Sequence, residues 1–334
     1  MAPQHIRLTL GSTSKKDTIM PKVAVITRTK NRIIMLSRAA RSVSAQTFRD
    51  FIWVVVNDGG DAAEVDRLVD LYRASMPEVV VVHHAVNKGM EAASNAGIAA
   101  SSSEFLVIHD DDDTWEPTFL ERAVGFLEQE SKIPFGGVVT AITHVDEEMT
   151  EKEVVIRATK PWHPTHSAYP VGAIQLADLC VINQFAPIAF VFRRSVYDEI
   201  GGYDESLPVL GDWEFNLRFV ARYDIAALPD LLANYHHRPA SKNSYGNSVL
   251  AGALSHVAYD AVLRNRIIRN AKDPRYSDIA DLVAQGRSTL QVKAYGSGVV
   301  DLTNRLLGYL VPMAKKARAA KRKVARLARK ALGR

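Results

Sequence analysis

Four consecutive carboxylates stand at Asp110–Asp113, directly after the apolar run Phe105–Ile108. Adjacent anions repel one another, so such a run costs stability unless a positive charge lies among them. Carboxylate oxygens are preferred ligands of Mg²⁺ and Mn²⁺, and Mg²⁺ usually binds one or two carboxylates together with substrate phosphates. Trp115 and Pro117 follow and would fix the exit of the run. The pattern favours a divalent-cation site that grips a phosphorylated substrate over the alternative, a solvated acidic loop.

The elements that must position this run alternate regularly before it. Apolar runs predict strands over 22–27, 51–56, 79–84 and 105–108. Helical spacing predicts helices over 32–44, 61–75 and 87–100, with Asn31 and Asn87 as N-caps of the first and third. This alternation is typical of βαβ units and a mostly parallel sheet. Because such sheets bind ligands beyond the carboxyl ends of their strands, the polar clusters that follow each strand are expected to meet the acidic run.

The second half of the chain is less regular. Strands are expected over 135–145, 153–158, 188–192 and 231–237, a loop over 161–172, and helices over 195–200, 212–222 and from 249 onward. Asp212 stands at the start of one of these helices, where an aspartate can serve simply as a cap. The pair His236-His237 ends the last expected strand. Adjacent residues on a strand point to opposite faces, so at most one of the two should reach a given site.

The order and spacing of these clusters resemble those of the family 2 glycosyltransferases. The matching segments are Arg28–Arg32 (RTKNR), Asn57–Asp61 (NDGGD), Asn87–Gly89 with Ala93–Gly97 (ASNAG), Asp110–Asp113, Phe192–Glu205 and Leu210–Arg218 (LGDWEFNLR). The resemblance covers roughly residues 22–240. It implies a GT-A type α/β fold, with a Rossmann-like, mostly parallel sheet flanked by helices. A helical C-terminal extension is expected beyond it.

The resemblance also implies an activity: metal-dependent, inverting transfer of a hexose from a nucleotide diphosphate-sugar, with a UDP-sugar favoured. The acceptor would be a hydroxyl of a saccharide or a lipid-linked acceptor, in polysaccharide or glycolipid synthesis. The residues that would bind the nucleotide are Thr29, Asn31, Arg32, Asp58, Asn87, Lys88, Asp110 and Asp111. For Asp58, which precedes two glycines, the alternative is that it only shapes a turn.

The same resemblance implies the metal ligands and the base. Asp112 would be the principal ligand of Mn²⁺ or Mg²⁺, with Asp110 as its partner, and His236 is favoured over His237 to complete the metal shell. Asp212 would be the general base that deprotonates the acceptor. A single carboxylate suffices, because a metal-bound diphosphate leaves without being protonated.

Three positions depart from the family pattern. Gly211 stands where the family usually has Glu, Ser94 where an Arg often contacts the diphosphate, and Asn57 where the second motif begins with Asp. The diphosphate would then be held by Lys88, Arg32 or the metal. The sugar and the acceptor stay open.

The charge of the chain is uneven. Residues 311–334 hold ten of the 42 Lys and Arg residues and no acidic residue, so residues 1–310 carry 32 basic against 37 acidic residues. A basic amphipathic helix over 312–334 would suit an anionic membrane surface, and a solvated tail is the alternative. Interleaved aromatic residues are absent there, so nucleic acid is not an expected partner. The expected organisation is an N-terminal extension (1–20), a glycosyltransferase domain (21–245) with nucleotide-binding (21–115) and acceptor (116–245) halves, a helical extension (246–310) and the tail (311–334).

The single cysteine, Cys180, excludes an internal disulfide and a four-cysteine zinc site. Together with the lack of a recognisable signal peptide or long apolar run, it favours a cytoplasmic protein, peripheral on the inner face of the plasma membrane if the tail binds there. Two alternative functions make different demands on the sequence. A sugar-phosphate nucleotidyltransferase should carry a glycine-rich loop after the first strand, which RTKNR lacks. A non-catalytic nucleotide-sugar-binding scaffold should have lost Asp110, Asp112 or Asp212, all of which are present.

Overall fold

The computed structural model describes residues 20–130, 132–149, 154–162, 172–238 and 253–286. The chain divides into two compact units. The first comprises the chain up to Leu176 together with Asn183–Leu263, and the second comprises Ala177–Ile182 together with the chain from Arg264. The expected domain boundary at 245 and the basic tail over 311–334 lie outside the described residues. In the described ranges, no helix combines the length and the apolar content that crossing a bilayer requires.

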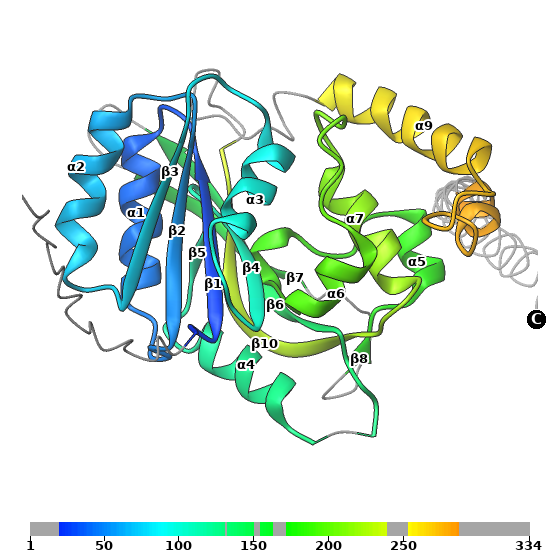
Figure 1. Cartoon of the computed structure of the whole chain (residues 1–334), viewed down its shortest axis with the longest axis horizontal. Helices are drawn as coiled ribbons and strands as arrows, with labels where there is room; N and C mark the ends of the chain where they lie inside the picture. The colour runs from blue at the N-terminus through cyan, green and yellow to red at the C-terminus, as the bar shows by residue number, and fades with distance from the viewer. Residues whose placement is uncertain (1–19, 131, 150–153, 163–171, 239–252, 287–334) are drawn as a thin grey trace, which may run out of the picture. The chain divides into compact units, whose positions relative to one another are not determined.

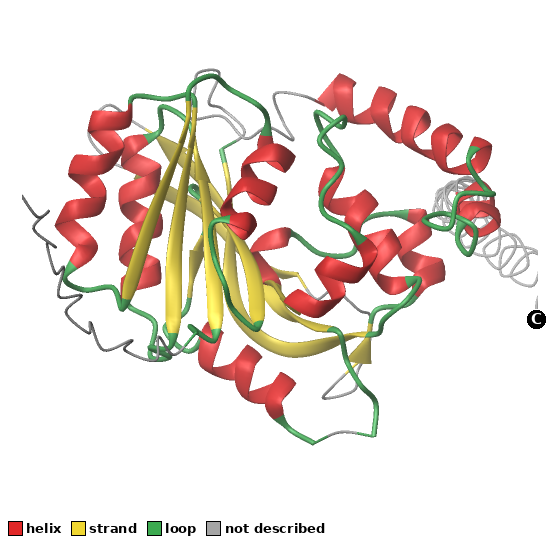
Figure 2. Ribbon diagram, in the orientation of Figure 1, coloured by secondary structure: helices red, strands yellow, loops and turns green. Residues whose placement is uncertain are grey.

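The first unit is built on the parallel sheet that the sequence predicts. Its first four strands are β1 (Val23–Thr29), β2 (Phe51–Asp58), β3 (Glu78–His84) and β4 (Phe105–Asp110), arranged side by side in the order β3-β2-β1-β4. They alternate along the chain with α1 (Ile33–Ser44), α2 (Ala62–Arg73) and α3 (Met90–Ala99) (Figure 1). All eight residues of β2 are buried, as expected of a strand with helices on both of its faces (Figure 2).

The sheet continues in the order β4-β9-β6-β10-β5, in which β9, β6 and β10 come from the second half of the chain. β6 (Gly137–Met149) and β10 (Ile225–His237) are long parallel neighbours, whereas β9 (Phe190–Arg193) is antiparallel to β4 and β6. The remaining elements are β5 (Thr114–Trp115), α4 (Phe119–Glu128), β7 (Val154–Trp162), β8 (Gly172–Ala173), α5 (Leu176–Val181), η1 (Pro187–Ala189), α6 (Arg194–Ile200), α7 (Gly211–Val220) and α9 (Ala253–Arg269). β10 begins six residues before the strand expected at 231, and its pairing with β6 shifts register around Leu231. Part of the loop expected over 161–172 belongs to β7 and β8.

Two predicted helix caps are wrong. The N-cap of α1 is Arg32 and that of α3 is Gly89, and neither helix receives a side-chain cap. Asn31 lies one residue too early and adopts a left-handed backbone, with φ of 52°. Its side-chain oxygen instead accepts a hydrogen bond from the backbone N–H of Asp61, at 3.2 Å. It therefore ties the loop after β1 to the start of α2.

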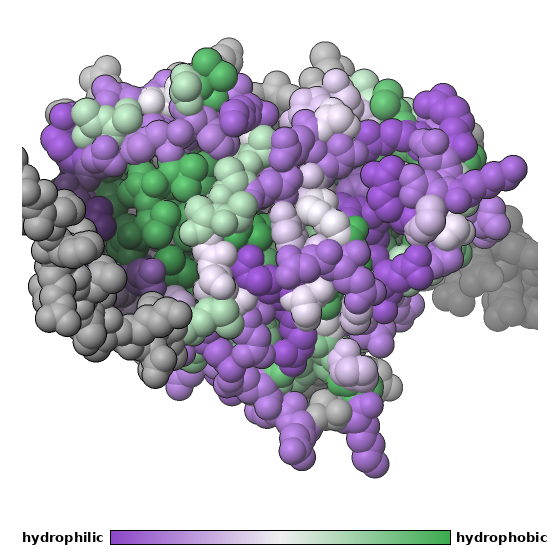
Figure 3. Space-filling model, in the orientation of Figure 1, coloured by the Kyte–Doolittle hydropathy of each residue, from purple (hydrophilic) through white to green (hydrophobic). Residues whose placement is uncertain are grey.

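Alternate side chains of the strands divide the core into two layers. Val25 and Val55 belong to the apolar cluster that includes Leu36 of α1 and Val65 of α2. Ile26 and Val56 point the other way, against α3. At the sheet edge the four valines of β3, Val79–Val82, are only partly buried, and Figure 3 shows apolar side chains gathered over this side of the sheet.

Candidate functional site

A cleft of about 960 Å³ lies at the carboxyl ends of β1, β2 and β4, within the size range of small-molecule sites. It is lined by the loops that follow these strands, by the start of α3, and by the segment 205–208 from the second half. Of the residues singled out from the sequence, the structure brings to this cleft Thr29, Asn31, Arg32, Asp58, Asn87, Lys88, Asp110 and Asp112. Asp111, Asp212 and His236 are not among its lining residues.

Asp110 ends β4 directly opposite Arg28 of β1 in the parallel register. The Arg28 guanidinium donates to Oδ1 of Asp110, through Nε at 3.0 Å and through Nη2. Nη1 of Arg28 also donates to Oγ of Ser94, at 3.1 Å. A guanidinium therefore lies beside position 94, although the side chain at that position is a serine. Among the described residues, Oδ2 of Asp110 has no hydrogen-bond partner.

Asp111 is fully buried and turned away from the cleft. It accepts hydrogen bonds from Thr29 Oγ1, at 2.7 Å, and from the Arg32 guanidinium. Burial raises the pKa of Asp111 to about 7, against the opposing effect of Arg32. The structure thus gives Asp111 a positioning role for the loop after β1. It does not place this carboxylate where the predicted direct contact with a nucleotide would require it.

Asp112 lines the cleft and contacts three arginines. Its carboxylate pairs with Arg238, which is fully buried, and lies 3.4 Å from Nη1 of Arg32, while its backbone oxygen accepts from Arg38. Burial alone would raise the pKa of Asp112, but these three cations hold it below its usual value. Asp110 and Asp112 together offer carboxylate oxygens at the cleft, so their chemistry fits a hard divalent cation. Such a cation would share Asp112 with the guanidinium groups.

His236 lies on the face of the sheet away from the cleft. Its Nδ1 is 2.8 Å from Oε2 of Glu147, and its Nε2 is 2.9 Å from Oγ1 of Thr114. Both ring nitrogens are engaged by protein groups, one of them Thr114, directly after the acidic run, and the backbone N–H of His236 donates to Oδ1 of Asp113 at 2.9 Å. His236 thus lies beside the run but does not line the cleft with Asp110 and Asp112. The reason is the strand alternation: the residue that shares the face of Tyr235, which lines the cleft, is His237.

Asp58 lines the cleft and also holds the next loop in place. Its carboxylate accepts hydrogen bonds from the backbone N–H groups of Lys88 and Gly89, at 2.8 and 2.9 Å, and lies 2.7 Å from Nδ1 of His84. Burial alone would raise the pKa of Asp58, but these hydrogen bonds lower it. Gly59 has a φ of +79°, and a side chain there would also lie within 2.7 Å of the backbone of Val86. Asp58 thus fixes the loop of Lys88 and Gly89 while its side chain lines the cleft, and its contact with a nucleotide stays a prediction.

Asp212 is the second residue of α7, whose N-cap is Leu210. Asp212 is therefore not the N-cap residue of this helix. Its carboxylate accepts a hydrogen bond from Asn183 Nδ2 at 2.8 Å. Burial raises the pKa of Asp212, and Arg28 and Asp110 lie close enough for their charges to act on it. These neighbours place Asp212 beside the acidic end of the cleft, although it does not line the cleft itself.

Glu91 is a cleft residue that the sequence motifs did not indicate. It lies in the first turn of α3, is 5% exposed, and lines the cleft. A Cβ atom built on Gly211 would come within 2.5 Å of the Glu91 carboxyl carbon. Burial raises the pKa of Glu91 to about 7, with Arg28 opposing the rise and Asp212 adding to it. Where the family usually has a glutamate at position 211, this chain thus places the Glu91 carboxyl group from α3 in the space beside Gly211. In the sequence, only the unusual glycine at 211 pointed to this arrangement.

Comparison with known sequences gives matches over most of this unit. The family model described as "Glycosyl transferase family 2" matches residues 24–201. The uncharacterized glycosyltransferase YwdF of Bacillus subtilis is 27% identical over 230 residues, which cover 66% of this chain and 76% of that protein. The PGL/p-HBAD biosynthesis glycosyltransferase of Mycobacterium bovis is 26% identical over 229 residues, covering 68% and 78%.

Solved structures match the fold at lower sequence identity. S. aureus TarS 1-349 has a TM-score of 0.58 and 17% identity, covering 80% of this chain and 72% of that one. The mannosyltransferase PcManGT from Pyrobaculum calidifontis has a TM-score of 0.51 and 15% identity, covering 87% and 81%. At such identities the likeness is one of fold alone.

Proposed function

Because the chain belongs to glycosyl transferase family 2 and has the α/β architecture of the GT-A enzymes, we propose that it is a metal-dependent, inverting glycosyltransferase. The donor would be a nucleotide diphosphate-sugar, with a UDP-sugar favoured, and the acceptor a hydroxyl of a saccharide or a lipid-linked acceptor in polysaccharide or glycolipid synthesis. The observation that carries the proposal is the cleft into which the ends of β1, β2 and β4 and the loop after β3 bring Thr29, Asp58, Asn87, Asp110 and Asp112.

The proposed nucleotide-sugar donor is supported by the charged side chains of the cleft and by the ligands of the matched structures. TarS 1-349 has been solved with UDP-GlcNAc, and PcManGT with GDP-Man and Mn²⁺. In this chain Arg28, Lys30, Arg32 and Lys88 line the cleft. Arg28 pairs with Asp110, and we propose Arg32 and Lys88, with Lys30 beside them, as the cations that bind a diphosphate. Mn²⁺ or Mg²⁺, held by Asp110 and Asp112, would neutralise charge on the leaving diphosphate. His236 is not included among the proposed ligands, because both of its ring nitrogens have protein partners.

Asp212 is the proposed general base. Its carboxylate would take the proton of the acceptor hydroxyl as the hydroxyl oxygen attacks the anomeric carbon, and the bond from that carbon to the diphosphate oxygen breaks. Attack from the side opposite the leaving group inverts the anomeric configuration. The raised pKa of Asp212 supports this role, since a more basic carboxylate accepts a proton more readily.

We propose a cytoplasmic location, in which the basic segment 312–334 binds an anionic membrane surface. Its support is the charge of that segment, ten Lys and Arg without an acidic residue. Such attachment would suit a lipid-linked acceptor.

Calorimetric titration tests the donor site. UDP, GDP and dTDP are titrated in turn, with Mn²⁺ and with EDTA, and we expect UDP to bind only with Mn²⁺. Asp112→Asn should weaken this binding by about tenfold or more, because it removes a charged ligand. Asp70→Asn, which changes an exposed carboxylate paired with Arg73, is the matched control. Absence of metal-dependent binding for all three nucleotides would exclude the proposed function.

Measuring nucleotide binding and donor hydrolysis on the same proteins distinguishes the role of the general base from that of the donor site. Asp212→Asn should bind UDP as the wild type does, yet lose about 100-fold or more in donor hydrolysis, in which water replaces the acceptor hydroxyl. Hydrolysis at the wild-type rate would remove Asp212 from the mechanism.

A further inference from the structure

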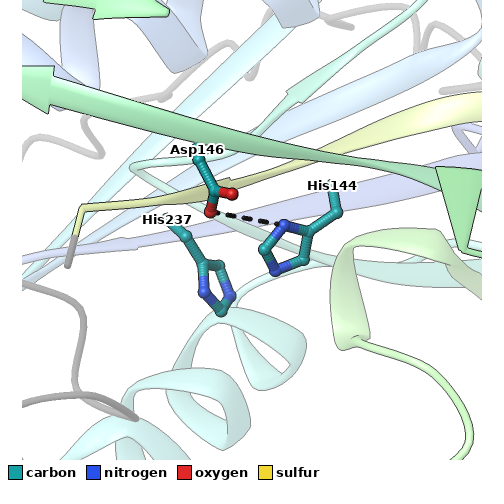
Figure 4. Close-up of side chains that lie close together, drawn as sticks. All are labelled: His144, Asp146 and His237. Atoms are coloured by element: carbon teal, nitrogen blue, oxygen red, sulfur yellow. Dashed lines mark ion pairs between the residues drawn. The ribbon is translucent and has the colours of Figure 1, made fainter. Parts of the chain in front are cut away.

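Three potential metal ligands meet where β6 and β10 end. His144 and Asp146 are two residues apart on β6, so their side chains share one face of the sheet. His237, the last residue of β10, is the register partner of Asp146, and partners on neighbouring strands project to the same face. Figure 4 shows the two imidazoles and the carboxylate turned toward one another. One ligand atom from each residue lies within 4.8 Å of the others.

The nitrogens of this cluster lack ordinary partners. Nδ1 of His144 and Nε2 of His237 are both shielded from solvent and have no hydrogen-bond partner among the described residues. Nδ1 of His144 lies 3.6 Å from Oδ1 of Asp146, too far for a hydrogen bond. Buried polar atoms are nearly always satisfied in folded proteins. An ion bound among the three side chains would satisfy both nitrogens and the carboxylate together.

The chemistry of the cluster selects the kind of ion. Two imidazoles and one carboxylate suit Zn²⁺ and other divalent transition metals, whereas Mg²⁺ prefers oxygen ligands alone. The acidic run offers only oxygens, so the two sites would differ in their metal preference. Three protein ligands also leave coordination positions open for water or a substrate group.

The position of the cluster connects it to the cleft. The ring of Tyr235 lies 4.5 Å from that of His237 and 6.0 Å from that of His144, measured between centroids. Tyr235 also lines the cleft. An ion in the cluster would therefore lie on the cleft face of the sheet, near enough to the acidic run for the charge of Asp112 to act on His237.

We propose that His144, Asp146 and His237 bind one divalent transition-metal ion, at a site distinct from the cation site of the acidic run. The proposal goes beyond the proposed function and does not depend on it. Nucleotide binding and binding at this cluster involve different side chains, so either can fail while the other stands.

The test is a Co²⁺ titration of the tag-free, full-length protein at about pH 8, where ordinary imidazoles are neutral. Visible absorption of protein-bound Co²⁺ reports nitrogen ligation. We expect a spectrum that saturates at one ion per chain, that Zn²⁺ abolishes by displacement, and that excess Mg²⁺ leaves unchanged. His144→Ala and His237→Ala should each weaken Co²⁺ binding by at least about 10–100-fold, since loss of even an outer-shell partner has that effect.

Three further variants keep the result interpretable. His83→Ala removes a histidine of β3 that pairs with Asp66, and it should leave the spectrum unchanged. Asp146→Asn preserves the shape of the cluster, so its weaker Co²⁺ binding would show that loss of binding does not come from misfolding. Asp110→Asn alters the acidic run alone, and the spectrum should persist. The proposal is overturned if the wild type shows no spectrum, if the cluster variants bind Co²⁺ as the wild type does, or if Asp110→Asn abolishes the signal.

Discussion

Glu91 and Gly211 form a complementary pair at the scale of single residues. Gly211 begins α7 with an ordinary helical backbone, so the requirement for glycine there is one of space. The space is taken by the Glu91 carboxyl group, which reaches across from α3. One consequence is that a carboxylate stands beside Asp212 without being its neighbour in the chain. Burial and the charge of Asp212 both raise the pKa of Glu91, to about 7, which reduces the repulsion between the two carboxyl groups.

A double-mutant cycle tests this pair. Gly211→Ala should lower the free energy of unfolding by about 1–3 kcal/mol, because the new methyl group overlaps a buried side chain. In a Glu91→Ala background the same change should cost much less, because the overlapping atoms are gone. Denaturant unfolding of the four proteins measures the interaction energy. Equal effects of Gly211→Ala in both backgrounds would contradict the steric account.

At the scale of elements, α3 matters most for the site, because it carries Glu91 and follows the loop of Asn87 and Lys88. Gly97 sets how closely this helix approaches the sheet. A Cβ atom at this position would overlap the side chain of Ile26 and lie 3.0 Å from that of Val56. Close approach at Gly97 therefore sets how closely α3 packs on β1 and β2.

Gly97→Ala should accordingly destabilise the protein by about 1–3 kcal/mol, because the helix must move outward or the strand side chains must shift. Gly125→Ala is the matched control. It lies inside α4, where a Cβ atom would meet nothing within 4 Å, so it should stabilise by about 0.4–1 kcal/mol through the unfolded state. Thermal or urea unfolding gives both values. A Gly97→Ala protein as stable as the control would show that α3 is not held by this contact.

At the scale of the whole molecule, a buried ionic network joins distant elements behind the cleft. Glu147 of β6 accepts from Arg38 of α1, at 2.8 and 3.0 Å, and from Arg238 after β10, at 2.6 Å. It also pairs with His236. Arg238 continues to Asp112. Burial alone would raise the pKa of Glu147, but His236 and Arg38 lower it to about 2. The network fixes the acidic run to both halves of the sheet.

The lowered pKa of Glu147 predicts that the folded protein loses stability in acid. Because the folded-state pKa of Glu147 is depressed from 4.5 to about 2, its ionised form contributes stability above about pH 4.5, and that contribution is lost as the pH falls toward 2. Glu147→Gln should lower the free energy of unfolding by about 3 kcal/mol near neutral pH. The difference in this free energy between the variant and the wild type should be smaller at about pH 3. Glu148→Gln, on an exposed pair with Arg157, should change it by less than about 1 kcal/mol at either pH. A gap that is the same at both pH values would contradict this assignment.

The sequence by itself determined the architecture and the general place of the site. Apolar periodicity is a local property, so the order of strands and helices could be inferred from it, and parallel strands must bring their carboxyl ends to one edge. Thr29, Asp58, Asn87 and the acidic run were expected to meet for that reason; Thr29, Asp58 and Asn87 line one cleft with Asp110 and Asp112.

Tertiary structure alone decided which side chain faces which way. Asp112 reaches the cleft and Asp111 does not. Thr29 and Arg32 hold the buried Asp111 carboxylate, whereas Arg238, from beyond β10, pairs with Asp112. His236 turns from the cleft because β6 and β10 pair in a register that sets it beside Glu147. Glu91 joins the site because Gly211, far along the chain, leaves it room. Each of these choices depends on contacts between residues some 80 to 125 positions apart, and such contacts exist only once the elements have packed.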